Sequence, residues 1–434
     1  VRMAEPLVKW ATEVNRLEDL PRIMRRAAKI ALSPPTGPVF ISLPGDILNK
    51  EAKIDLGKST RVIDTYRPSH NSIELIAKKI SKYKKPVIIA GHEVATSDAF
   101  REITMFAEYT GSAVYQQTVP HGSHYPSEHM AFMGTLPRLQ KPTKNILENY
   151  DLLICVGCDG LRMSVWSDTE PLPSKMPIIH IGINEWEIGK NYSTELAIIG
   201  NVKNTLYDIN QHLKNTLTSK ETIKAKQNLE LITKTNWNLN KKNLTAKTLN
   251  DKFKKPITPN WLMMNIANNI TKNNIVVEEG LVSTRTLLNY LPFKNNKDFY
   301  GLASGGIGWA VSGAIGVSLA NPSKTIVAII GDGSSMYGIQ SLWSAAHYKL
   351  PIVYIIANNQ SYRIIKERLE AFHKNTNFVG MDFNKPKIDF VKLSNSLGIK
   401  SETINNPKNL NSIFNKAFKY KKPYLLNVMV DKGY

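Results

Sequence analysis

The sequence predicts an α/β protein that is built from doubly wound parallel sheets. Short apolar runs rich in Val and Ile alternate with segments of helical period over residues 70–213, and again over residues 257–434. Residues 324–362 show the pattern most clearly, because two apolar runs bounded by Gly or Pro enclose a stretch in which apolar residues recur at helical spacing. Two buried strands joined in this way form a parallel βαβ unit, and a succession of such units builds a doubly wound sheet.

Within residues 324–362 we expect a strand at 325–330, a tight Gly-Asp-Gly turn, a helix at about 337–348 and a second strand at 352–357. Parallel strands end at the same edge of a sheet. The side chains of Asp332 and Asn359 should therefore lie together in the crevice beyond the strand ends.

A carboxylate beside an amide oxygen, next to free N–H groups at a helix start, suits a magnesium ion that also binds phosphate oxygens. We therefore interpret Asp332 and Asn359 as side-chain ligands of Mg²⁺, with the N–H groups of Gly333, Ser334 and Ser335 facing a diphosphate. The tripeptide alone is also explained by a strand-to-helix turn with an N-capping Asp. The flanking strands and Asn359 favour the diphosphate site.

A Gly-Asp-Gly at 331–333 followed by Asn-Asn at 358–359 resembles the thiamine diphosphate binding motif. The stretch GDGSSMYGIQSLWSAAHYKLP resembles the 2-oxo acid decarboxylase and acetolactate synthase superfamily, and the last third of the chain resembles benzoylformate decarboxylase in particular. The resemblance implies thiamine diphosphate and Mg²⁺ as cofactors, a small 2-oxo acid as substrate, and Asp332, Asn359 and Ser361 as metal ligands. The cofactor-binding residues that it implies are Leu281, Val282, Gly305, Gly306, Ile307, Gly331, Asp332, Gly333, Ser334, Ser335, Asn359, Ser361 and Tyr362.

The glycine-rich stretch GLASGGIG, residues 301–308, has two interpretations. In the superfamily a bulky apolar residue beneath the cofactor holds it in a bent shape. The match places Ile307 there, with the Gly305 carbonyl accepting a hydrogen bond from the aminopyrimidine; without the match Ile307 would be an ordinary core residue. The stretch also resembles the nucleotide loop of short-chain dehydrogenases, and Tyr362 with Lys366 supplies a Tyr-x-x-x-Lys. A nicotinamide-dependent oxidoreductase is therefore the alternative, although its glycine spacing is shorter and its Tyr lies much further along the chain.

The substrate pocket departs from the family pattern. The resemblance implies loss of CO₂ from a 2-oxo acid, after which the remainder is released as an aldehyde or joined to a second carbonyl. Where benzoylformate decarboxylases carry an active-site His, this sequence has Arg162-Met163-Ser164, and charged residues that begin with Arg363 replace apolar pocket residues after Asn359. Ser164 and Arg363 are the expected pocket residues, and the differences put benzoylformate itself in doubt. For His92, His121 and His124 we expect surface or structural roles, although they could lie near the site.

The expected domain division follows the resemblance. Residues 1–55 contain a helix and a buried strand at 38–44, and resemble the end of a pyrimidine-binding domain; residues 70–213 form a central domain, 214–256 a solvated helical linker and 257–434 the diphosphate-binding domain. Because Val1 lies within what resembles folded sequence, we expect a further N-terminal part. The Glu that activates the cofactor would belong to that part, so residues 1–434 alone are expected to be a catalytically inert fragment that binds the cofactor or takes part in assembly.

Composition excludes several other classes. The formal net charge is +20, but the lysines are scattered among Asn and Ile without an arginine-rich stripe, so we expect no nucleic-acid partner. No apolar run reaches the roughly 18 residues of a membrane span and no signal peptide is visible, so the cytoplasm is the expected location. Cys155 and Cys158 have no second Cys pair for a zinc site and are expected to be buried core residues.

Two further expectations concern FAD and assembly. The central domain has no G-x-G-x-x-G after its first expected strand, only Ala90-Gly91-His92 and later Gly157-Cys158-Asp159-Gly160, so we expect no FAD. The family analogy implies a homodimer or homotetramer with active sites between subunits.

Overall fold

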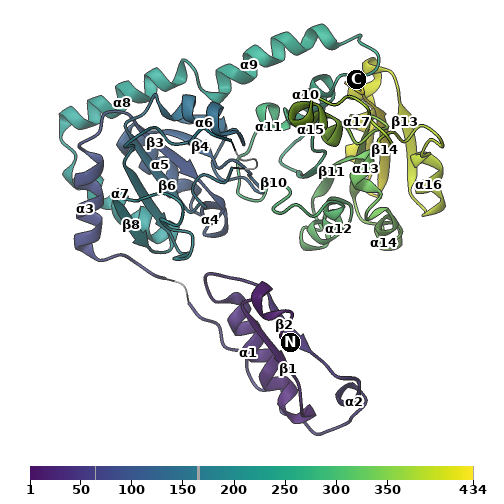
Figure 1. Cartoon of the computed structure of the whole chain (residues 1–434), viewed down its shortest axis with the longest axis horizontal. Coiled ribbons are helices and arrows are strands. Elements are labelled where there is room, and N and C mark those ends of the chain that lie inside the picture. The colour runs from purple at the N-terminus through teal and green to yellow at the C-terminus, as the bar shows by residue number, and fades with distance from the viewer. Residues whose placement is uncertain (64, 164–166, 434) are drawn as a thin grey trace.

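The computed structural model describes residues 1–63, 65–163 and 167–433. They form two six-stranded parallel sheets and one separate pair of strands. Figure 1 shows the two sheets in neighbouring lobes, bridged along one side by α8 (Ser219–Thr233) and α9 (Trp237–Thr248), with the N-terminal unit set apart from both. The α/β fold class with parallel sheets is confirmed; the domain boundaries stay a prediction.

The N-terminal unit is small. Strand β1 pairs in parallel with β2, and α1 packs beside them. The prediction of a buried strand at 38–44 is wrong, because the residues of β2 are half-buried or exposed; a two-stranded pair with one helix offers little interior. The sequence pattern also misses β1. The elements are η1 (Glu5–Leu7), β1 (Trp10–Glu13), η2 (Leu17–Asp19), α1 (Leu20–Leu32), β2 (Val39–Ser42) and α2 (Gly45–Leu48).

The central lobe is built on a parallel sheet with the strand order β5-β4-β3-β6-β7-β8. This is the order of dinucleotide-binding domains, whose switch point lies between the first and fourth strands, here β3 and β6. Helices α3, α5 and α7 bury their apolar faces on one side of the sheet, and α6 contributes to the other. The elements are α3 (His70–Ile80), β3 (Pro86–Ala90), α4 (His92–Thr96), α5 (Phe100–Thr110), β4 (Ala113–Gln116), β5 (Phe132–Thr135), α6 (Gln140–Leu147), β6 (Leu152–Val156), β7 (Ile178–Gly182), β8 (Leu196–Ile199) and α7 (Val202–Thr216).

The segment 214–256 is helical, as expected, but it is not merely solvated. Leu229 of α8 and Trp237 of α9 are 5% and 3% exposed and belong to the core of the central lobe. The Trp237 indole also donates a hydrogen bond to the Leu288 carbonyl of the C-terminal lobe at 2.9 Å. The sparse apolar residues of this segment therefore anchor it to both lobes.

The C-terminal lobe has the strand order β10-β9-β11-β12-β14-β13, all parallel. Helices α10, α11 and α17 cover one face, while α12, α14 and α16 cover the other. The elements after η3 (Leu249–Asp251) are α10 (Pro259–Asn269), β9 (Asn274–Glu279), α11 (Leu287–Tyr290), β10 (Phe299–Tyr300), α12 (Trp309–Ala320), β11 (Thr325–Gly331), α13 (Asp332–Ser335), η4 (Ile339–Ser341), α14 (Leu342–His347), β12 (Ile352–Asn358), α15 (Arg363–His373), α16 (Phe390–Ser396), β13 (Lys400–Ile404), η5 (Pro407–Asn409), α17 (Leu410–Lys419) and β14 (Tyr424–Met429).

The predicted βαβ unit at 324–362 is present, with one correction. Both strands form where expected and pair in parallel, with Gly331 opposite Ala357. The single helix expected at 337–348 is replaced by η4 and α14, and a separate short helix, α13, comes before them. The helix is interrupted at Gly338, where a Cβ atom would lie 2.8 Å from the Gly308 carbonyl oxygen. Close packing against another segment therefore breaks a helix that the periodicity alone would continue.

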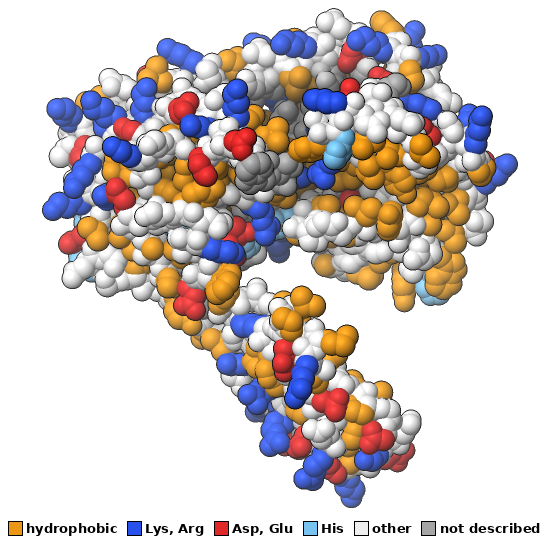
Figure 2. Space-filling model, in the orientation of Figure 1, with side chains coloured by type: hydrophobic (Ala, Val, Ile, Leu, Met, Phe, Trp, Pro, Cys, Tyr) orange, Lys and Arg blue, Asp and Glu red, His pale blue; other side chains and the backbone are white. Residues whose placement is uncertain are grey.

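The surface agrees with the charge pattern of the sequence. Figure 2 shows Lys and Arg side chains spread over both lobes and the N-terminal unit on this face, without a continuous stripe. In the described ranges, no helix combines the length and the apolar character that crossing a membrane requires.

Candidate cofactor site

The site begins where two neighbouring strands end. Asp332 follows β11 and Asn359 follows β12; the two residues are 3% and 6% exposed and line one pocket. Parallel pairing of β11 with β12 brings the two chain ends together, as the sequence predicts. The pocket is lined by Gly280, Leu281, Val282, Ser283, Gly331, Asp332, Gly333, Ser334, Asn359, Ser361, Tyr362, Arg363 and Ile364.

Two buried oxygen atoms in this pocket lack a hydrogen-bond partner among the described residues. They are Oδ2 of Asp332 and Oγ of Ser361. Oδ1 of Asp332 accepts from its neighbour, the Gly333 N–H, at 2.9 Å, and Oδ1 of Asn359 accepts from the Ser361 N–H at 2.9 Å. A buried oxygen without a partner is unfavourable unless a ligand satisfies it.

Burial also sets the charge of this pocket. It raises the pKa of the Asp332 carboxyl to about 6, against the opposing effect of the Gly333, Gln360 and Ser361 N–H groups. A bound cation would keep the carboxylate ionised. The donors here are one carboxylate, one amide and a hydroxyl, which suits a hard cation that takes its remaining ligands from phosphate. Nowhere in residues 1–63, 65–163 and 167–433 do three or more His, Cys, Asp or Glu side chains form a metal-holding group.

The backbone around the pocket is held in an unusual conformation at two positions. Leu281, beside Val282 in the loop after β9, has a φ of 48°, and Gln360, between Asn359 and Ser361, has a φ of 56°. Non-glycine residues rarely adopt this region, and they tend to do so at functional sites. Helix α13 has only four residues and so offers no long helix dipole, and the Gly333 N–H already donates to Asp332. Binding of a diphosphate by the N–H groups of this turn stays a prediction.

The ring of Tyr362 packs directly against the turn at Gly333. A Cβ atom at Gly333 would lie 2.8 Å from Cε1 of Tyr362, so the close approach of the ring requires glycine. Tyr362 packs edge-on against Phe383, with ring centroids 4.4 Å apart, and its N–H donates to the Met381 carbonyl. The following helix is fixed by the buried Lys366, whose ammonium donates to Asp382 at 2.8 Å.

Other expected cofactor residues lie apart from this pocket. Ser335 is buried behind it, where its hydroxyl donates to the Asp332 carbonyl. Gly305 and Gly306 are in an exposed loop before α12, and Ile307 is 36% exposed. That loop does not contribute to the lining around Asp332. Its role in binding stays a prediction.

The two expected substrate-pocket residues have different outcomes. Ser164 lies outside the described residues. Arg363 lines the Asp332 pocket, but its guanidinium donates to Glu367 at 3.0 Å and to the Asp431 carbonyl at 3.4 Å. Arg363 thus ties α15 to the segment after β14, and its charge is already paired. A direct role for Arg363 in substrate binding is not favoured by these contacts.

Sequence reasoning missed Glu279, which is 1% exposed at the end of β9. Its carboxylate accepts hydrogen bonds from the N–H groups of Gly308 and Ala310, at 2.8 Å for Ala310, and so caps the N-terminus of α12. Burial raises the pKa of this carboxyl, against the effect of these N–H groups. The sequence signal that could have indicated Glu279 is the pair Glu278-Glu279 at the end of an otherwise apolar strand. Glu279 fixes the start of α12 directly after Ile307.

Comparison with known proteins gives the family. Residues 73–209 match "Thiamine pyrophosphate enzyme, central domain", and residues 282–428 match "Thiamine pyrophosphate enzyme, C-terminal TPP binding domain". The chain belongs to the thiamine pyrophosphate enzyme family. The two matched ranges fall within the central and C-terminal lobes, and the second includes Asp332, Asn359 and Ser361. The resemblance to this superfamily is thereby confirmed.

Individual relatives of this thiamine pyrophosphate enzyme share about a quarter of its residues. A probable acetolactate synthase large subunit of Methanococcus aeolicus is 28% identical over 452 residues, which cover 98% of this chain and 72% of the relative. A benzoylformate decarboxylase of Pseudomonas aeruginosa is 23% identical, covering 98% and 77%. The solved structure of a thiamine diphosphate-dependent 4-hydroxybenzoylformate decarboxylase from Rhodococcus jostii RHA1 superposes with a TM-score of 0.84 at 25% identity, covering 99% and 77%.

The alternative of a short-chain dehydrogenase is set aside. The glycine-rich stretch follows β10, an edge strand, whereas a dinucleotide loop follows the first strand at a switch point. The ammonium of Lys366 is held by Asp382, and the pKa of Tyr362 is raised by burial and by Tyr337 and Asp332 rather than lowered by a lysine. The Tyr-x-x-x-Lys spacing therefore does not correspond to an activated tyrosine.

Proposed function

We propose that this protein is a thiamine diphosphate- and Mg²⁺-dependent enzyme that decarboxylates a 2-oxo acid, and that releases an aldehyde or joins the remainder to a second carbonyl compound. The observation that carries the proposal is the pair of buried, unpartnered oxygen atoms of Asp332 and Ser361, beside the Gly333 turn. The names of the acetolactate synthase and benzoylformate decarboxylase relatives supply the reaction class.

In this proposal Asp332, Asn359 and Ser361 hold Mg²⁺, and the loops at Leu281–Val282 and at Gly333–Ser334 hold the diphosphate. When bound, thiamine diphosphate supplies a nucleophilic carbon and an electron-accepting ring for decarboxylation. Tyr362 covers the Gly333 turn and excludes water from the diphosphate end. With a pKa of about 6 the Asp332 carboxyl is already mostly ionised at neutral pH, and a bound cation would keep it ionised at lower pH as well.

The loop before α12 is the second contact region of the proposal. Glu279 holds the N–H groups of Gly308 and Ala310, and Gly308 has a φ of 91° and packs directly against Tyr337. Two segments, β9 and the turn after α13, therefore hold Gly308, the residue that follows Ile307. This geometry supports Ile307 as the side chain beneath the cofactor and Gly305 as the acceptor for its aminopyrimidine.

We also propose that FAD is absent from the central lobe. A dinucleotide would bind at the switch point between the ends of β3 and β6. Here a Cβ atom at Gly91 would collide with Gly157 and Cys158, and the Glu93 carboxylate fills the adjacent space and accepts from the Ile183 N–H at 2.8 Å. This packing at the switch point supports the proposal that no FAD binds there.

The assembly is proposed to be a homodimer or homotetramer with sites between subunits, in the cytoplasm. Support comes from the exposed side chains near the loop before α12, among them Ile307, Met336 and Tyr337, which are 36%, 41% and 59% exposed. A second subunit that covers them would also enclose the cofactor loop.

The test is calorimetric titration of thiamine diphosphate with Mg²⁺ into the full-length protein and its Asp332→Ala variant. We expect saturable, Mg²⁺-dependent binding that weakens at least about 100-fold in the variant, because a buried charged ligand is lost. Asp389→Ala is the control, since Asp389 is an aspartate that caps the N-terminus of α16 and does not line this pocket. Comparison of CO₂ release from pyruvate with CO₂ release from benzoylformate then distinguishes an acetolactate synthase-like from a benzoylformate decarboxylase-like substrate preference. Absence of Mg²⁺-dependent binding to the unmodified protein would refute the cofactor assignment.

A further inference from the structure

Strand β9 ends in two glutamates whose side chains point to opposite faces of the sheet. Glu279 points toward α12 and caps its N-terminus. Because successive side chains of a strand alternate between the two faces, Glu278 points toward the face that α10, α11 and α17 cover. The two carboxylates therefore contact different loops.

The loop that follows β9, residues 280–284, is folded around the Glu278 carboxylate. Oε1 of Glu278 accepts a hydrogen bond from the Gly280 N–H at 2.8 Å and a second one from the Thr284 hydroxyl. The same hydroxyl lies 3.3 Å from the Leu281 carbonyl oxygen. One carboxylate oxygen thus holds both ends of the loop.

The loop is tight enough to restrict its own residues. A Cβ atom at Gly280 would lie 2.1 Å from Cγ2 of Thr284, so this position requires glycine. Leu281 has a φ of 48°, which is unfavourable for a residue with a side chain. A residue keeps such a conformation only where the surrounding contacts impose it. Those contacts include the two hydrogen bonds to Glu278.

The loop also forms one side of the pocket that contains Asp332. Residues 280–283 all line this pocket. A Cβ atom at Gly331 would lie 3.9 Å from the Gly280 carbonyl oxygen, so the loop packs against the Gly-Asp-Gly turn. The conformation of the loop therefore determines the shape of one pocket wall.

A cation of the central lobe faces the same carboxylate. Burial raises the pKa of Glu278, while the hydrogen bonds from Thr284 and Gly280 and the positive charge of Arg138 lower it. Arg138 lies between β5 and α6, and the charge of Glu278 acts in turn on the pKa of its guanidinium. The carboxylate is therefore held by its own loop and interacts with a charge from the other lobe.

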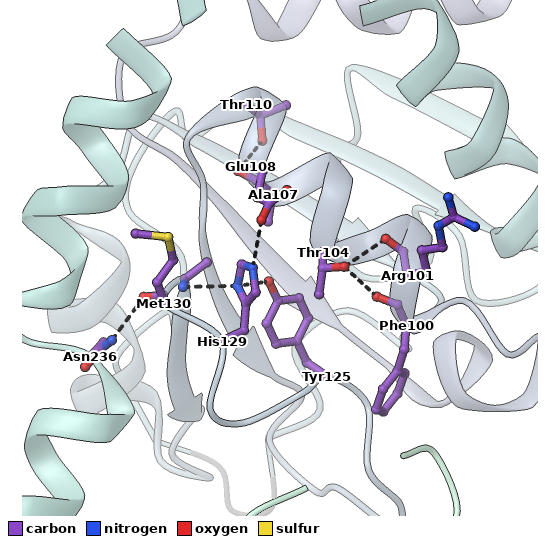
Figure 3. Close-up of polar contacts among 11 residues, drawn as sticks. Phe100, Arg101, Thr104, Ala107, Glu108, Thr110, Tyr125, His129, Met130 and Asn236 are labelled. Carbon is purple, nitrogen blue, oxygen red and sulfur yellow. Dashed lines mark hydrogen bonds and ion pairs between the residues drawn. The ribbon is translucent and has the colours of Figure 1, made fainter. Parts of the chain in front are cut away.

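Glu108 of α5 shows a carboxylate with a different kind of contact. Figure 3 shows it beside the ring of His129, whose Nε2 lies 3.3 Å from Oε1 of Glu108. Glu108 is exposed on the central lobe and is not part of the pocket lining. It links two side chains at the surface, whereas Glu278 shapes the backbone of a loop.

We propose that Glu278 is a positioning residue, which holds residues 280–284 in the conformation that receives the diphosphate of the cofactor. This inference rests on the proposed function, which assigns the diphosphate partly to this loop. Without the carboxylate, the Gly280 N–H and the Thr284 hydroxyl would lose their acceptor, and a buried donor without an acceptor is unfavourable. The loop would then leave the conformation that Leu281 adopts here, and the affinity for the diphosphate would fall.

The first test is the affinity of the full-length protein for thiamine diphosphate with Mg²⁺, measured by calorimetry. Glu278→Ala should weaken binding at least about 10-fold, because two hydrogen bonds that shape the loop are lost. Glu278→Gln keeps an acceptor oxygen and should stay within about 3-fold of the unmodified protein. Thr284→Val and Thr284→Ser form a second pair, in which only the valine variant lacks the hydroxyl and should bind more weakly. Glu108→Ala is the control and should bind like the unmodified protein.

Amide hydrogen exchange of the cofactor-free, full-length protein gives a readout that depends neither on turnover nor on binding. In Glu278→Ala the peptide that covers residues 278–286 should exchange at least about 10-fold faster. Residues 259–269 of α10 should exchange at an unchanged rate. A general loss of stability would instead accelerate exchange in both segments.

The outcomes separate this inference from the proposed function. Equal cofactor affinity of the unmodified protein and Glu278→Ala would overturn the inference and leave the proposed function standing. Unchanged exchange in residues 278–286, or equally accelerated exchange in residues 259–269, would also overturn it. Absence of Mg²⁺-dependent binding to the unmodified protein would refute the proposed function, and the inference with it.

Discussion

Glu93, Glu279 and Asp332 are buried carboxylates that follow or end parallel strands. Each accepts backbone N–H groups, from Ile183, from Gly308 and Ala310, and from Gly333, respectively. Burial raises the pKa of all three. They differ in what remains unsatisfied, because of these three only Asp332 keeps a buried carboxylate oxygen without a partner among the described residues; Glu102 of α5 has one as well. Asp332 is marked as a ligand candidate by the combination of that oxygen with a position in the lining of the pocket.

Glu93 gives a pH prediction. Its folded-state pKa of about 7 lies above the ordinary value of 4.5. The stability associated with its proton is therefore fully present below about pH 4.5 and is lost as the pH rises through about 7. Glu93→Gln stays neutral, so it should gain stability relative to the original protein over this window, by at most about 3 kcal/mol at pH 8.

Urea unfolding at pH 5 and pH 8 measures the difference. Glu148→Gln is the control, because Glu148 is an exposed carboxylate at the end of α6 in the same lobe. A gain for Glu93→Gln that is equal at both pH values would contradict the assignment of the buried charge.

Helix α12 shows how an element is positioned by its first residues. Its N-terminus is capped by Glu279, and Gly308 precedes it with a φ of 91° in contact with Tyr337. The helix itself is apolar on all sides and rich in small residues, so its sequence does not select one facing direction. The Glu279 cap and the Gly308 contact determine instead which side of α12 faces the sheet.

Gly308→Ala should destabilise the protein by about 1–3 kcal/mol, because a side chain is strained at positive φ and would collide with Tyr337. Gly316→Ala in the same helix meets no atom within 4 Å and is exposed, so it should stabilise by about 0.5–1 kcal/mol. Thermal unfolding of the two variants checks both signs. A loss of cofactor affinity in Gly308→Ala alone would further link the loop to binding.

A second prediction about individual elements concerns helices α8 and α9. Trp237 packs against Phe132 with ring centroids 6.3 Å apart, and its indole donates to the C-terminal lobe. Trp237→Ala should cost about 3–5 kcal/mol, as for other buried aromatic side chains. Leu231→Ala, at a position that is 57% exposed on α8, should change stability by less than about 0.5 kcal/mol. If both variants lower the free energy of unfolding by the same small amount in chemical denaturation, residues 214–256 would be a solvated linker, as the sequence predicts.

At the scale of the whole molecule, apolar side chains remain exposed on the C-terminal lobe. Figure 2 shows hydrophobic side chains gathered over the region of α12 and α14. Trp343, Tyr348 and Leu319 are 56%, 61% and 56% exposed there. Contiguous apolar surface of this kind marks an interaction site. The proposed second subunit would cover it.

Trp343→Asp should therefore shift the protein toward the monomer, because it places a charge in the proposed interface. Trp186→Asp is the matched control, since Trp186 is 74% exposed on the central lobe beside Lys190. Sedimentation equilibrium with each variant decides the matter. An unchanged oligomeric state in Trp343→Asp, or a monomeric parent protein, would exclude this surface as the interface.

The sequence by itself determined the α/β class, the βαβ unit at 324–362 and the meeting of Asp332 with Asn359. These follow from local periodicity and from the rule that parallel strands end at one edge, so they need no knowledge of distant contacts. The Gly-Asp-Gly at 331–333 followed by Asn-Asn at 358–359 then predicted thiamine diphosphate as the cofactor. The break at Gly338, the cap from Glu279 and the anchoring of Trp237 were decided only by tertiary structure. Each depends on which segment packs against another far along the chain, and a pattern of neighbouring residues carries no record of that packing.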